Sequence, residues 1–517
     1  MSIFSIFLKK KPKENKKAKK SYEEMKKEEL GDIASSSLRE HEKGITDIFD
    51  EATDLIKHPL TLRTGTNMLL YYFEGLTDGV ALKDNVIHPL LHDVHEDWQV
   101  VEPHTIACYM SKVKTWDEVE KGLLQGQSVL FIDGYNEALV INTKGWAERS
   151  VEESKTETTI KGSHDGFVEN VSKNIGLIRR YVPTTELKIK RLTIGERAET
   201  EVYMMYLGDV ANPEVVQAVE NRINKIKVDT ISNIGTLSRY TEDNTWSPFP
   251  QSYTTERPDA TAAHILQGKV VVMVDRSPSA MIVPINLTGF FQTPDDYNTS
   301  WLVASFTRML RYVGFAMAIL LPAIYIAIIS FHFEVVPLSL YLSIAESRAR
   351  VPFSPFLEAI FMEITLEMLR EAGIRLPPPI GQTIGIVGGI VIGQAAVQAG
   401  MVSNIMVIVV SITAIASFIV PNIDLSSSIR LIRFPMMVIA YFYGMIGIVI
   451  GMMVLVAHLI TLESFGTPYG VPIAPLRWRD LKDTFVRLPE SMLTKRPEAA
   501  NTMQEQKQSE SNGDANE

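Results

Sequence analysis

Apolar residues follow two different patterns along the 517-residue chain, and the pattern changes near residue 300. Before that point they form short runs or alternate with polar residues, which is typical of strands and amphipathic helices in soluble proteins. After it, the run from Tyr312 to Phe331 contains no charged residue. A run of about 20 such residues can cross the roughly 30 Å hydrocarbon core of a bilayer. We therefore predict a soluble N-terminal region followed by an all-α, multi-span membrane domain.

The soluble region is predicted to be α+β, with two subdomains. Short apolar or alternating segments indicate strands. These segments are residues 68–73, 128–132, 138–141, 187–194, 201–207, 269–274 and 281–285. Asn212 and Pro213 predict the start of a helix, because Asn can cap free N–H groups and Pro suits the first helical position. The apolar face of this helix comprises Val215, Val216, Val219 and Ile223.

Uncharged stretches give four spans, at about 312–331, 381–402, 404–421 and 434–460. Arg308 and Arg311 precede the first span, as the positive-inside rule favours for entry from the cytoplasm. Four spans return the C-terminus to the cytoplasm but leave four arginines of the segment 334–380 outside. These are Arg348, Arg350, Arg370 and Arg375. A re-entrant or extra half-span within 334–380 is the alternative.

The predicted organisation has five parts. They are a basic tail and helix at 1–45, a first α+β subdomain at 46–150, a second at 160–300, the membrane domain at 301–465 and a cytoplasmic C-terminal tail at 466–517. The lysines near the N-terminus follow a short apolar patch, whereas a secretory signal has its positive charges first. We therefore expect the N-terminal region to stay in the cytoplasm.

Composition and the absence of known motifs argue against a nucleic-acid-binding protein, a disulfide-linked protein and an enzyme. The net charge of −10 gives no reason to expect a nucleic-acid partner, and the single Cys108 cannot form an intrachain disulfide. An acidic and histidine-rich run, His92 to Asp97, has metal-ligand residue types, but no second cluster completes a site. No phosphate-binding glycine loop, zinc-protease motif or nucleophile elbow occurs, so we expect neither a cofactor nor enzymatic activity.

Small and amide residues mark the second predicted span. Gly381, Gly385, Gly389 and Gly393 recur every four residues and would share one helix face. Close backbone contact through such residues holds helices together in lipid. The face could pack within the chain or form a pore or oligomer interface. Gln394 and Gln398 lie one turn apart beside it. Buried amides in lipid need polar partners, so they could join helices or line a pore.

A glutamate-rich helix is predicted at 355–372, with Ser354 and Pro355 at its start. Glu363, Glu367 and Glu371 follow one another at four-residue steps, so they share one arc of the helix. Such a helix could lie on the membrane with a solvated polar face. A ring of such helices could instead form a cation-attracting mouth.

Five segments resemble signatures of the GerA family of bacterial spore germinant receptor A subunits, and they occur in the family's order. They are 162–170 (GSHDGFVEN), 174–180 (NIGLIRR), 375–397 (RLPPPIGQTIGIVGGIVIGQAAV), 403–406 (SNIM) and 463–469 (ESFGTPY). The family-motif residues that we single out are Gly162, Asp165, Gly166, Arg179, Arg180, Pro377, Pro378 and Pro379. One departure is Arg276, where we expect glycine.

The resemblance implies a role in waking dormant spores. Family A subunits sit in the spore inner membrane with a transporter-like B subunit and a lipoprotein C subunit. They are thought to oligomerise and form an ion path that releases monovalent cations. The resemblance also leaves Arg179 and Arg180 with two roles, a soluble-domain interface or a structural ion pair.

Three alternatives remain at this stage. A stage V sporulation AF-like paralogue, which resembles the A subunit, would amplify the germination signal. A secondary transporter would move a solute itself, although transporters usually have more spans and inverted repeats. A membrane-anchored scaffold would leave all activity to the soluble domains.

Overall fold

The computed structural model describes residues 31–92, 109–145, 157, 162–377, 389, 391–498 and 502–507. The chain divides into two compact units. The first comprises Met1–Phe49 and Leu55–Trp146, and the second comprises Asp50–Asp54 and Ala147–Glu517.

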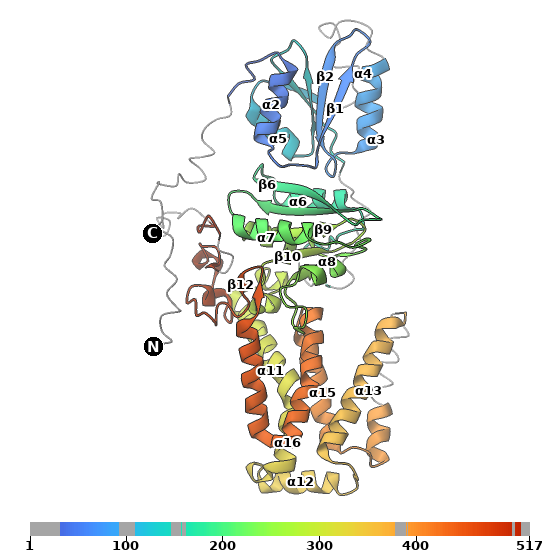
Figure 1. Cartoon of the computed structure of the whole chain (residues 1–517), viewed down its shortest axis with the longest axis vertical. Coiled ribbons are helices and arrows are strands. Elements are labelled where there is room, and N and C mark those ends of the chain that lie inside the picture. The colour runs from blue at the N-terminus through green and yellow to red at the C-terminus, as the bar shows by residue number, and fades with distance from the viewer. Residues whose placement is uncertain are drawn as a thin grey trace. The chain divides into compact units, whose positions relative to one another are not determined.

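The first unit is built on a five-stranded antiparallel sheet in the order β1-β2-β4-β5-β3 (Figure 1). Its elements are α2 (Leu38–Ile48), β1 (Leu55–Thr61), β2 (Asn67–Phe73), α3 (Gly79–Leu82), the π-helix Lys83–Ile87, α4 (His88–His92), β3 (Met110–Val113), α5 (Trp116–Leu124), β4 (Ser128–Ile132) and β5 (Ala138–Ile141). The strands predicted at 128–132 and 138–141 are confirmed, and they pair with each other, with Phe131 opposite Ala138. Gly134 lies in the connecting turn with φ 89°, a left-handed conformation that glycine adopts without strain.

The second unit begins with another five-stranded antiparallel sheet, in the order β6-β7-β9-β10-β8. Its elements are α6 (Val171–Tyr181), β6 (Leu187–Ile194), β7 (Thr200–Leu207), α7 (Pro213–Asn224), α8 (Ile234–Thr241), β8 (Tyr253–Thr255), α9 (Pro258–Leu266), β9 (Val270–Val274), β10 (Ala280–Val283), the 3-10 helix Leu287–Phe291 and α10 (Pro294–Tyr297). The structure has strands at all four segments predicted between 187 and 285, and β6 pairs with β7 and β9 with β10.

Helices cover both faces of this second sheet. Met204 and Val272 pack with Val219 of α7, whereas the neighbouring Met205 and Val271 pack on the opposite face, where α6 and α9 lie. This arrangement follows from the alternation of side chains along a strand. The predicted start of α7 is confirmed, since the Asn212 side chain accepts a hydrogen bond from Glu214 N and Pro213 is the first helical residue.

The backbone conformation at Arg276 is one that favours glycine. It has a φ of 68°, in the left-handed region that glycine occupies more readily than a residue with a Cβ atom. Its side chain is exposed. The departure therefore leaves the paired strands β9 and β10 intact.

The rest of the second unit is mainly helical. Its elements are α11 (Trp301–Phe331), the 3-10 helix Phe333–Val335, α12 (Leu338–Arg348), α13 (Pro355–Arg375), α15 (Asn404–Ile419), α16 (Ile423–Thr461), β11 (Glu463–Ser464), β12 (Thr467–Pro468) and the 3-10 helices Asp480–Asp483 and Glu490–Met492. Residues 391–398 are also helical. The soluble α+β region followed by a helical region confirms the predicted fold class.

Within the span predicted at 434–460, α16 breaks at Gly444. This residue has φ 59° and ψ −139°, which is not helical. A Cβ atom at Gly451 would lie 2.8 Å from the sulfur of Met436, although residues 15 apart in a straight helix are about 22 Å apart. The two halves of α16 therefore run back along each other as a helical hairpin. Uniform hydropathy hid this break from the sequence prediction.

The helix α13 packs into the helical region with its charged side inward. Glu358 and Glu363 are buried, whereas Phe361, Ile364 and Met368 are exposed. A surface helix of a soluble protein has the opposite arrangement. Phe356 of α13 stacks on Tyr441, with ring centroids 4.6 Å apart, so α13 runs against the first half of α16. Of the two hypotheses for this helix, the solvated polar face therefore does not hold for Glu363, whose side chain is 3% exposed.

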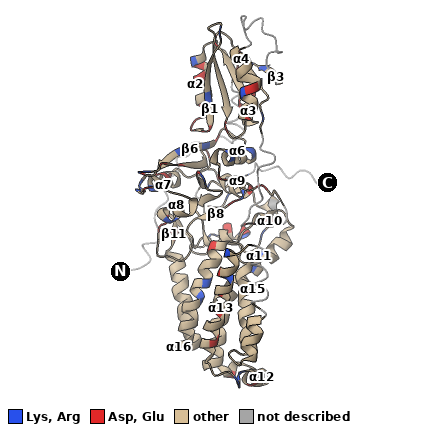
Figure 2. Ribbon diagram, turned by 90° about the vertical axis from the view of Figure 1, so that its right-hand side faces the viewer, with Lys and Arg blue, Asp and Glu red and all other residues tan. Residues whose placement is uncertain are grey.

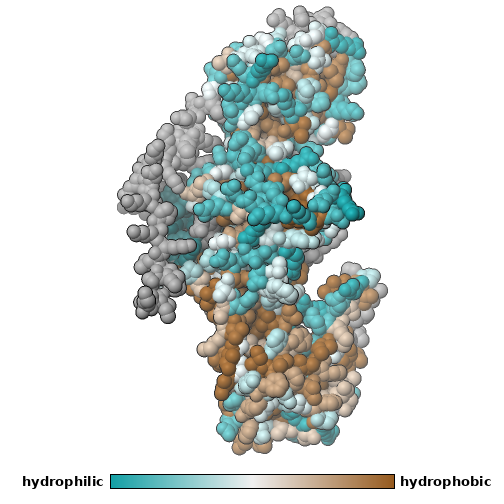
Figure 3. All heavy atoms as spheres, viewed as in Figure 1, coloured by the Kyte–Doolittle hydropathy of each residue, from teal (hydrophilic) through white to brown (hydrophobic). Residues whose placement is uncertain are grey.

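The outer surface of the helical region is apolar. Figure 3 shows hydrophobic residues gathered over these helices, and they include Ile415, Phe418, Phe442 and Ile446, each more than 60% exposed. Exposed apolar patches of this kind mark interaction or membrane surfaces. In the part of the chain that the structure describes, the helices α11 and α16 are long and apolar enough to cross a membrane.

Candidate charged sites of the helical region

Charged residues are sparse on α16, and α15 carries none (Figure 2). One charged pair joins α13 to α16. Arg433 donates a hydrogen bond to Glu363 Oε2 and a second, from Nε, to the carbonyl oxygen of Ala318 in α11 at 2.8 Å. The two side chains are 5% and 3% exposed. This pair therefore fixes three helices at one point.

One polar atom of each partner is left over. Glu363 Oε1 and Arg433 Nη2 have no hydrogen-bond partner among the described residues, although both atoms are buried. An unsatisfied buried polar atom costs about 1–3 kcal/mol. A water molecule, an ion or a shift of one helix could give these two atoms the hydrogen-bond partners that they lack here.

A second ion pair, with a buried carboxylate and a half-buried arginine, lies nearer the start of α13. Arg348 at the end of α12 contacts Glu358 Oε1 at 2.9 Å, and Ser403 N donates to Glu358 Oε2 at 3.0 Å. Ser403 is the N-cap of α15, so the carboxylate also faces the positive end of that helix dipole. Glu358 thus ties α12, α13 and α15 together.

Glu367 and Glu371 lie progressively nearer the surface. The side chain of Glu367 is 44% exposed and lies 3.4 Å from Arg430 Nη1 and 3.7 Å from Arg370 Nη1. Glu371 accepts from Arg375 at 2.8 Å, and both are exposed. The three glutamates predicted to act together thus lie in three environments. Of the three, Glu367 is the one that is both partly exposed and held close to the buried pair.

The predicted glycine and glutamine positions are only partly described. Gly381, Gly385, Pro378 and Pro379 lie outside the described residues, whereas Pro377 is exposed. Gly393 is buried, with Val407 3.8 Å from the position of a Cβ atom, and Gly389 has open space around it. Gln394 and Gln398 are exposed on this single chain. They are thus available to a neighbouring molecule or to an aqueous path.

A third charged network joins the helical region to the C-terminal tail. Arg308 of α11 is fully buried between Asp296, 3.2 Å away, and Asp483, 2.8 Å away. Arg311 also contacts Asp296 at 2.8 Å, and Tyr297 donates to Asp483 at 2.9 Å. The sequence analysis used both arginines only as topology signals. It missed their partners Asp296 and Asp483, because no sequence pattern connects these aspartates with the arginines.

Sequence reasoning also missed Glu358, Arg430 and Arg433. The two arginines lie inside α16, a long apolar helix. A charged residue inside such a segment is a signal for a functional or paired position. Placing the start of the last span at residue 434 excluded Arg433 from the segment and removed that signal.

The family-motif residues near 162–180 lie in and before α6, which covers one face of the second sheet. Arg179 is buried and forms a two-pronged ion pair with Asp54, with Nη2 2.7 Å from Oδ1. Asn174, in the same motif, bonds both the N and the O of Val168, at 2.9 and 2.6 Å. Gly162 has φ 134°, Gly166 is buried and Asp165 is half-buried, whereas Arg180 is exposed. Among the described residues, no group of three or more His, Cys, Asp or Glu could hold a metal ion, and Asp93 to Asp97 lie outside them.

Comparisons with known proteins give a consistent result. The chain matches the family described as Bacillus/Clostridium GerA spore germination protein over residues 43–499. It is 41% identical to spore germination protein B1 of Bacillus subtilis (strain 168) over 83% of this chain and 89% of that protein. It is 36% identical to spore germination protein GerLA of Bacillus cereus over 90% and 97% of the two chains.

Two further similarities concern the membrane and the soluble region. The chain is 39% identical to the uncharacterized membrane protein YfkQ of Bacillus subtilis (strain 168), over 90% of this chain and 91% of that one. The crystal structure of the N-terminal domain of the A subunit of the Bacillus megaterium spore germinant receptor GerK3 matches with 25% identity and a TM-score of 0.37. That match covers 48% of this chain and 95% of the crystallised one.

Proposed function

Because the chain belongs to the GerA family of spore germination proteins, we propose that it is the A subunit of a nutrient germinant receptor. In this role it transmits the binding of a germinant to an ion-conducting path in the membrane. Its partners are a transporter-like B subunit, a lipoprotein C subunit and further copies of itself.

The proposed location is the spore inner membrane, with the sheet-containing regions in the cytoplasm. Both ends of α16 lie near the second sheet domain, by which we mean the second five-stranded sheet (β6-β7-β9-β10-β8) with the helices that cover it. Near one end of α16, Ser428 donates to the Pro248 carbonyl, and near the other end His458 lies 2.9 Å from Ser247. Gly444 lies at the other end of α11, where a Cβ atom would meet His332 at 3.1 Å. The hairpin of α16 then crosses the bilayer twice and returns the chain to the cytoplasmic side.

This topology also makes α13 a crossing helix. Arg348, at the far side, is neutralised by Glu358, and Arg370 near the other end of α13 donates to Ser417 at 3.2 Å. Ser417 and its neighbour Ala416 lie in the same part of the bundle as Gly314 of α11, near the sheet domain. A crossing α13 therefore brings Arg370 and Arg375 back to the cytoplasmic side, as the positive-inside rule favours.

The observation that supports an ion path is the inward polar face of α13. Glu363, Glu367 and the arginines that pair with them lie between apolar helices, and charges in such a place are functional by default. Glu367 is the candidate for contact with a cation, because its carboxylate is partly exposed. Gln394 and Gln398 are candidate lining residues, and Gly389 is a candidate contact between copies.

The experiment compares spores that carry the Glu367→Gln chain with spores that carry Glu371→Gln. A nutrient mixture is added, and the release of potassium and sodium is recorded. We expect Glu367→Gln to change the rate of cation release and Glu371→Gln, whose ion pair is exposed, to leave it near wild type. Glu363 is unsuitable for this test, because its substitution would also disturb packing.

The result also separates the competing functions. A scaffold would release cations normally in both variants. An amplifier of the germination signal would leave the first cation release intact when the whole chain is deleted, and a solute transporter would show uptake of its solute by the chain without its partners. Co-purification with B and C subunits would support the receptor assignment, and their consistent absence would contradict it.

A further inference from the structure

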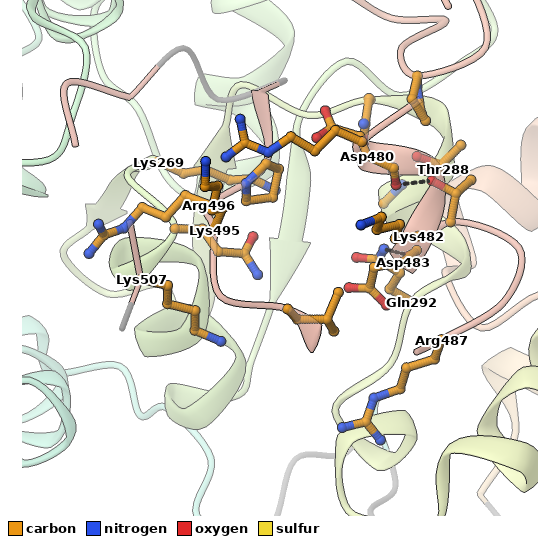
Figure 4. A pocket seen from close by; sticks show the side chains of 18 of the residues that line it. Lys269, Thr288, Gln292, Asp480, Lys482, Asp483, Arg487, Lys495, Arg496 and Lys507 are labelled. Carbon is orange, nitrogen blue, oxygen red and sulfur yellow. Dashed lines mark hydrogen bonds between the residues drawn. The ribbon is translucent and has the colours of Figure 1, made fainter. Parts of the chain in front are cut away.

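A cavity of about 390 Å³ lies between the second sheet domain and the C-terminal tail (Figure 4). The sheet domain contributes residues between Gln267 and Tyr297, and the tail contributes residues between Thr467 and Lys507. The volume is within the range of about 300–1,000 Å³ typical of small-molecule sites. Of the residues in the three charged sites, Tyr297 and Asp483 of the third network line this cavity.

The lining of the cavity is strongly cationic. It contains seven basic side chains and two carboxylates. The basic side chains are Lys269, Arg479, Lys482, Arg487, Lys495, Arg496 and Lys507, and the carboxylates are Asp480 and Asp483. Figure 4 shows Lys269, Lys495, Arg496 and Lys507 on one side of the cavity, with Lys482 and Asp483 on the other.

Both carboxylates are already engaged. Asp483 accepts from Arg308 and Tyr297, and Asp480 Oδ1 accepts from the backbone N of Glu498 at 2.9 Å. Among the described residues, no carboxylate forms an ion pair with Lys482, Lys495 or Lys507. The cavity therefore holds a net positive charge that the described chain does not balance.

Two arginines at the cavity have unused donors. Arg487 is 4% exposed, and its Nε has no hydrogen-bond partner in the described part of the chain. The same holds for Arg479 Nη2, although Nη1 of that residue contacts Glu498 and Glu505. A buried guanidinium N–H without a partner is costly, so it indicates a missing acceptor.

We propose that this cavity binds a phosphate-bearing anion. Several lysines converging on one space, together with arginine donors, is the arrangement that neutralises and hydrogen-bonds phosphate oxygens. The volume leaves room for more than a bare ion, so the phosphate belongs to a larger molecule or is accompanied by water.

The position of the cavity indicates what such a ligand would do. Arg487 N donates to Ser305 of α11 at 3.0 Å, and Asp483 bonds Arg308 of the same helix, so the tail is attached where the first apolar helix begins. The tail is also held on the sheet domain, since Met503 N donates to Val210 O at 2.9 Å. An anion bridging the two sides would fasten the tail, and with it α11, to the sheet domain.

Two sources of phosphate fit this chemistry. Basic pockets beside membrane helices on the cytoplasmic side bind anionic lipid headgroups, and a soluble phosphate metabolite would reach the same groups. Only the lipid source rests on the proposed membrane topology. The binding itself does not depend on a role in germination.

The test uses the full-length chain in zwitterionic detergent and in nanodiscs of phosphatidylcholine, with or without phosphatidylglycerol. The melting temperature is measured with inorganic phosphate, with chloride at equal ionic strength as the reference. Phosphate should raise it, because a ligand that binds only the folded state stabilises that state. Lys482→Gln and Lys495→Gln should each weaken the apparent affinity about five-fold. Lys227→Gln, at an exposed lysine outside the cavity, should not.

The nanodiscs identify the source. If phosphatidylglycerol raises the melting temperature and removes the response to phosphate, a lipid headgroup occupies the site. If the response to phosphate is the same in both kinds of nanodisc, the ligand is soluble. The proposal is overturned if neither probe raises the melting temperature, or if the two cavity variants respond as the Lys227→Gln variant does.

Discussion

Arg433 of α16 and Glu363 of α13 form a buried ion pair, and the same arginine also bonds the backbone of α11. Removing one charge from such a pair leaves the other uncompensated, which costs about 3–5 kcal/mol. We therefore expect Glu363→Gln to lower the free energy of unfolding of the full chain in detergent by that amount. Denaturant unfolding followed by tryptophan fluorescence measures it.

Glu371→Gln is the matched control for this prediction, because the ion pair of Glu371 with Arg375 is exposed. Exposed pairs contribute about 0–1 kcal/mol. A double change to Glu363→Leu and Arg433→Met should recover most of the loss, since apolar replacement of a whole buried pair is often neutral. If Glu363→Gln and Glu371→Gln lower the free energy of unfolding by the same amount, the buried pair does not stabilise the fold more than the exposed one, and the prediction is wrong.

Asp483 fixes the C-terminal tail through Arg308, which is fully buried. We expect Asp483→Asn to loosen the tail, because the substitution removes the charge that faces the guanidinium and weakens the hydrogen bond from Tyr297. Limited proteolysis with trypsin should then cleave the tail near Arg479 and Arg487 faster than in the wild type. Asp229→Asn, whose partner Arg197 is exposed, should leave the cleavage rate unchanged. Unchanged cleavage in Asp483→Asn would contradict this role.

Glu157 should make the stability depend on pH. Burial raises the pKa of its carboxyl group to about 7, although the hydrogen bond from Thr255 at 2.8 Å opposes the shift. The unfolded chain has a pKa near 4.5 for this group, so between pH 4.5 and about 7 the folded state keeps a proton that the unfolded state has released. The free energy of unfolding therefore falls as pH rises through this window and levels off above it.

The variant Glu157→Gln should remove that contribution. Its free energy of unfolding should fall less between pH 4.5 and 7 than that of the wild type, and the two curves should stay parallel above the window. Glu214→Gln, at an exposed position in the first turn of α7, should keep the wild-type slope. Identical slopes in wild type and Glu157→Gln would sink the prediction.

Local patterns predicted the soluble fold well. Strand alternation and the cap at Asn212 are properties of neighbouring residues, and the structure has both of them. Contacts between distant residues were not predictable in this way. Asp483 reaches Arg308 across 175 positions and Arg433 reaches Glu363 across 70, and nothing in the sequence pairs them.

The environment of α13 shows the same limit. Its periodicity correctly predicts a helix with one charged and one apolar side. Periodicity does not say which side faces the protein, because that depends on whether the surroundings are water or lipid. The hypothesis of a solvated polar face assumed that the charged side faces water. In the structure Glu363 is buried and Met368 is exposed, so part of the charged side faces the protein and the apolar side faces outward.

Gly444 should tolerate no side chain, because it makes the turn between the two halves of α16. Its φ of 59° and ψ of −139° belong to a region that residues with a Cβ atom occupy at a cost of about 1–3 kcal/mol. A Cβ atom would also lie 3.2 Å from the Phe331 ring. We expect Gly444→Ala to lower the free energy of unfolding in detergent by at least that amount. Gly235→Ala should instead be neutral or stabilising by up to about 1 kcal/mol, since Gly235 is helical and exposed, and the nearest atom to the position of its Cβ atom is 3.4 Å away. If both alanine variants unfold at the same denaturant concentration, α16 does not depend on a glycine turn, and the two-pass arrangement of this segment is wrong.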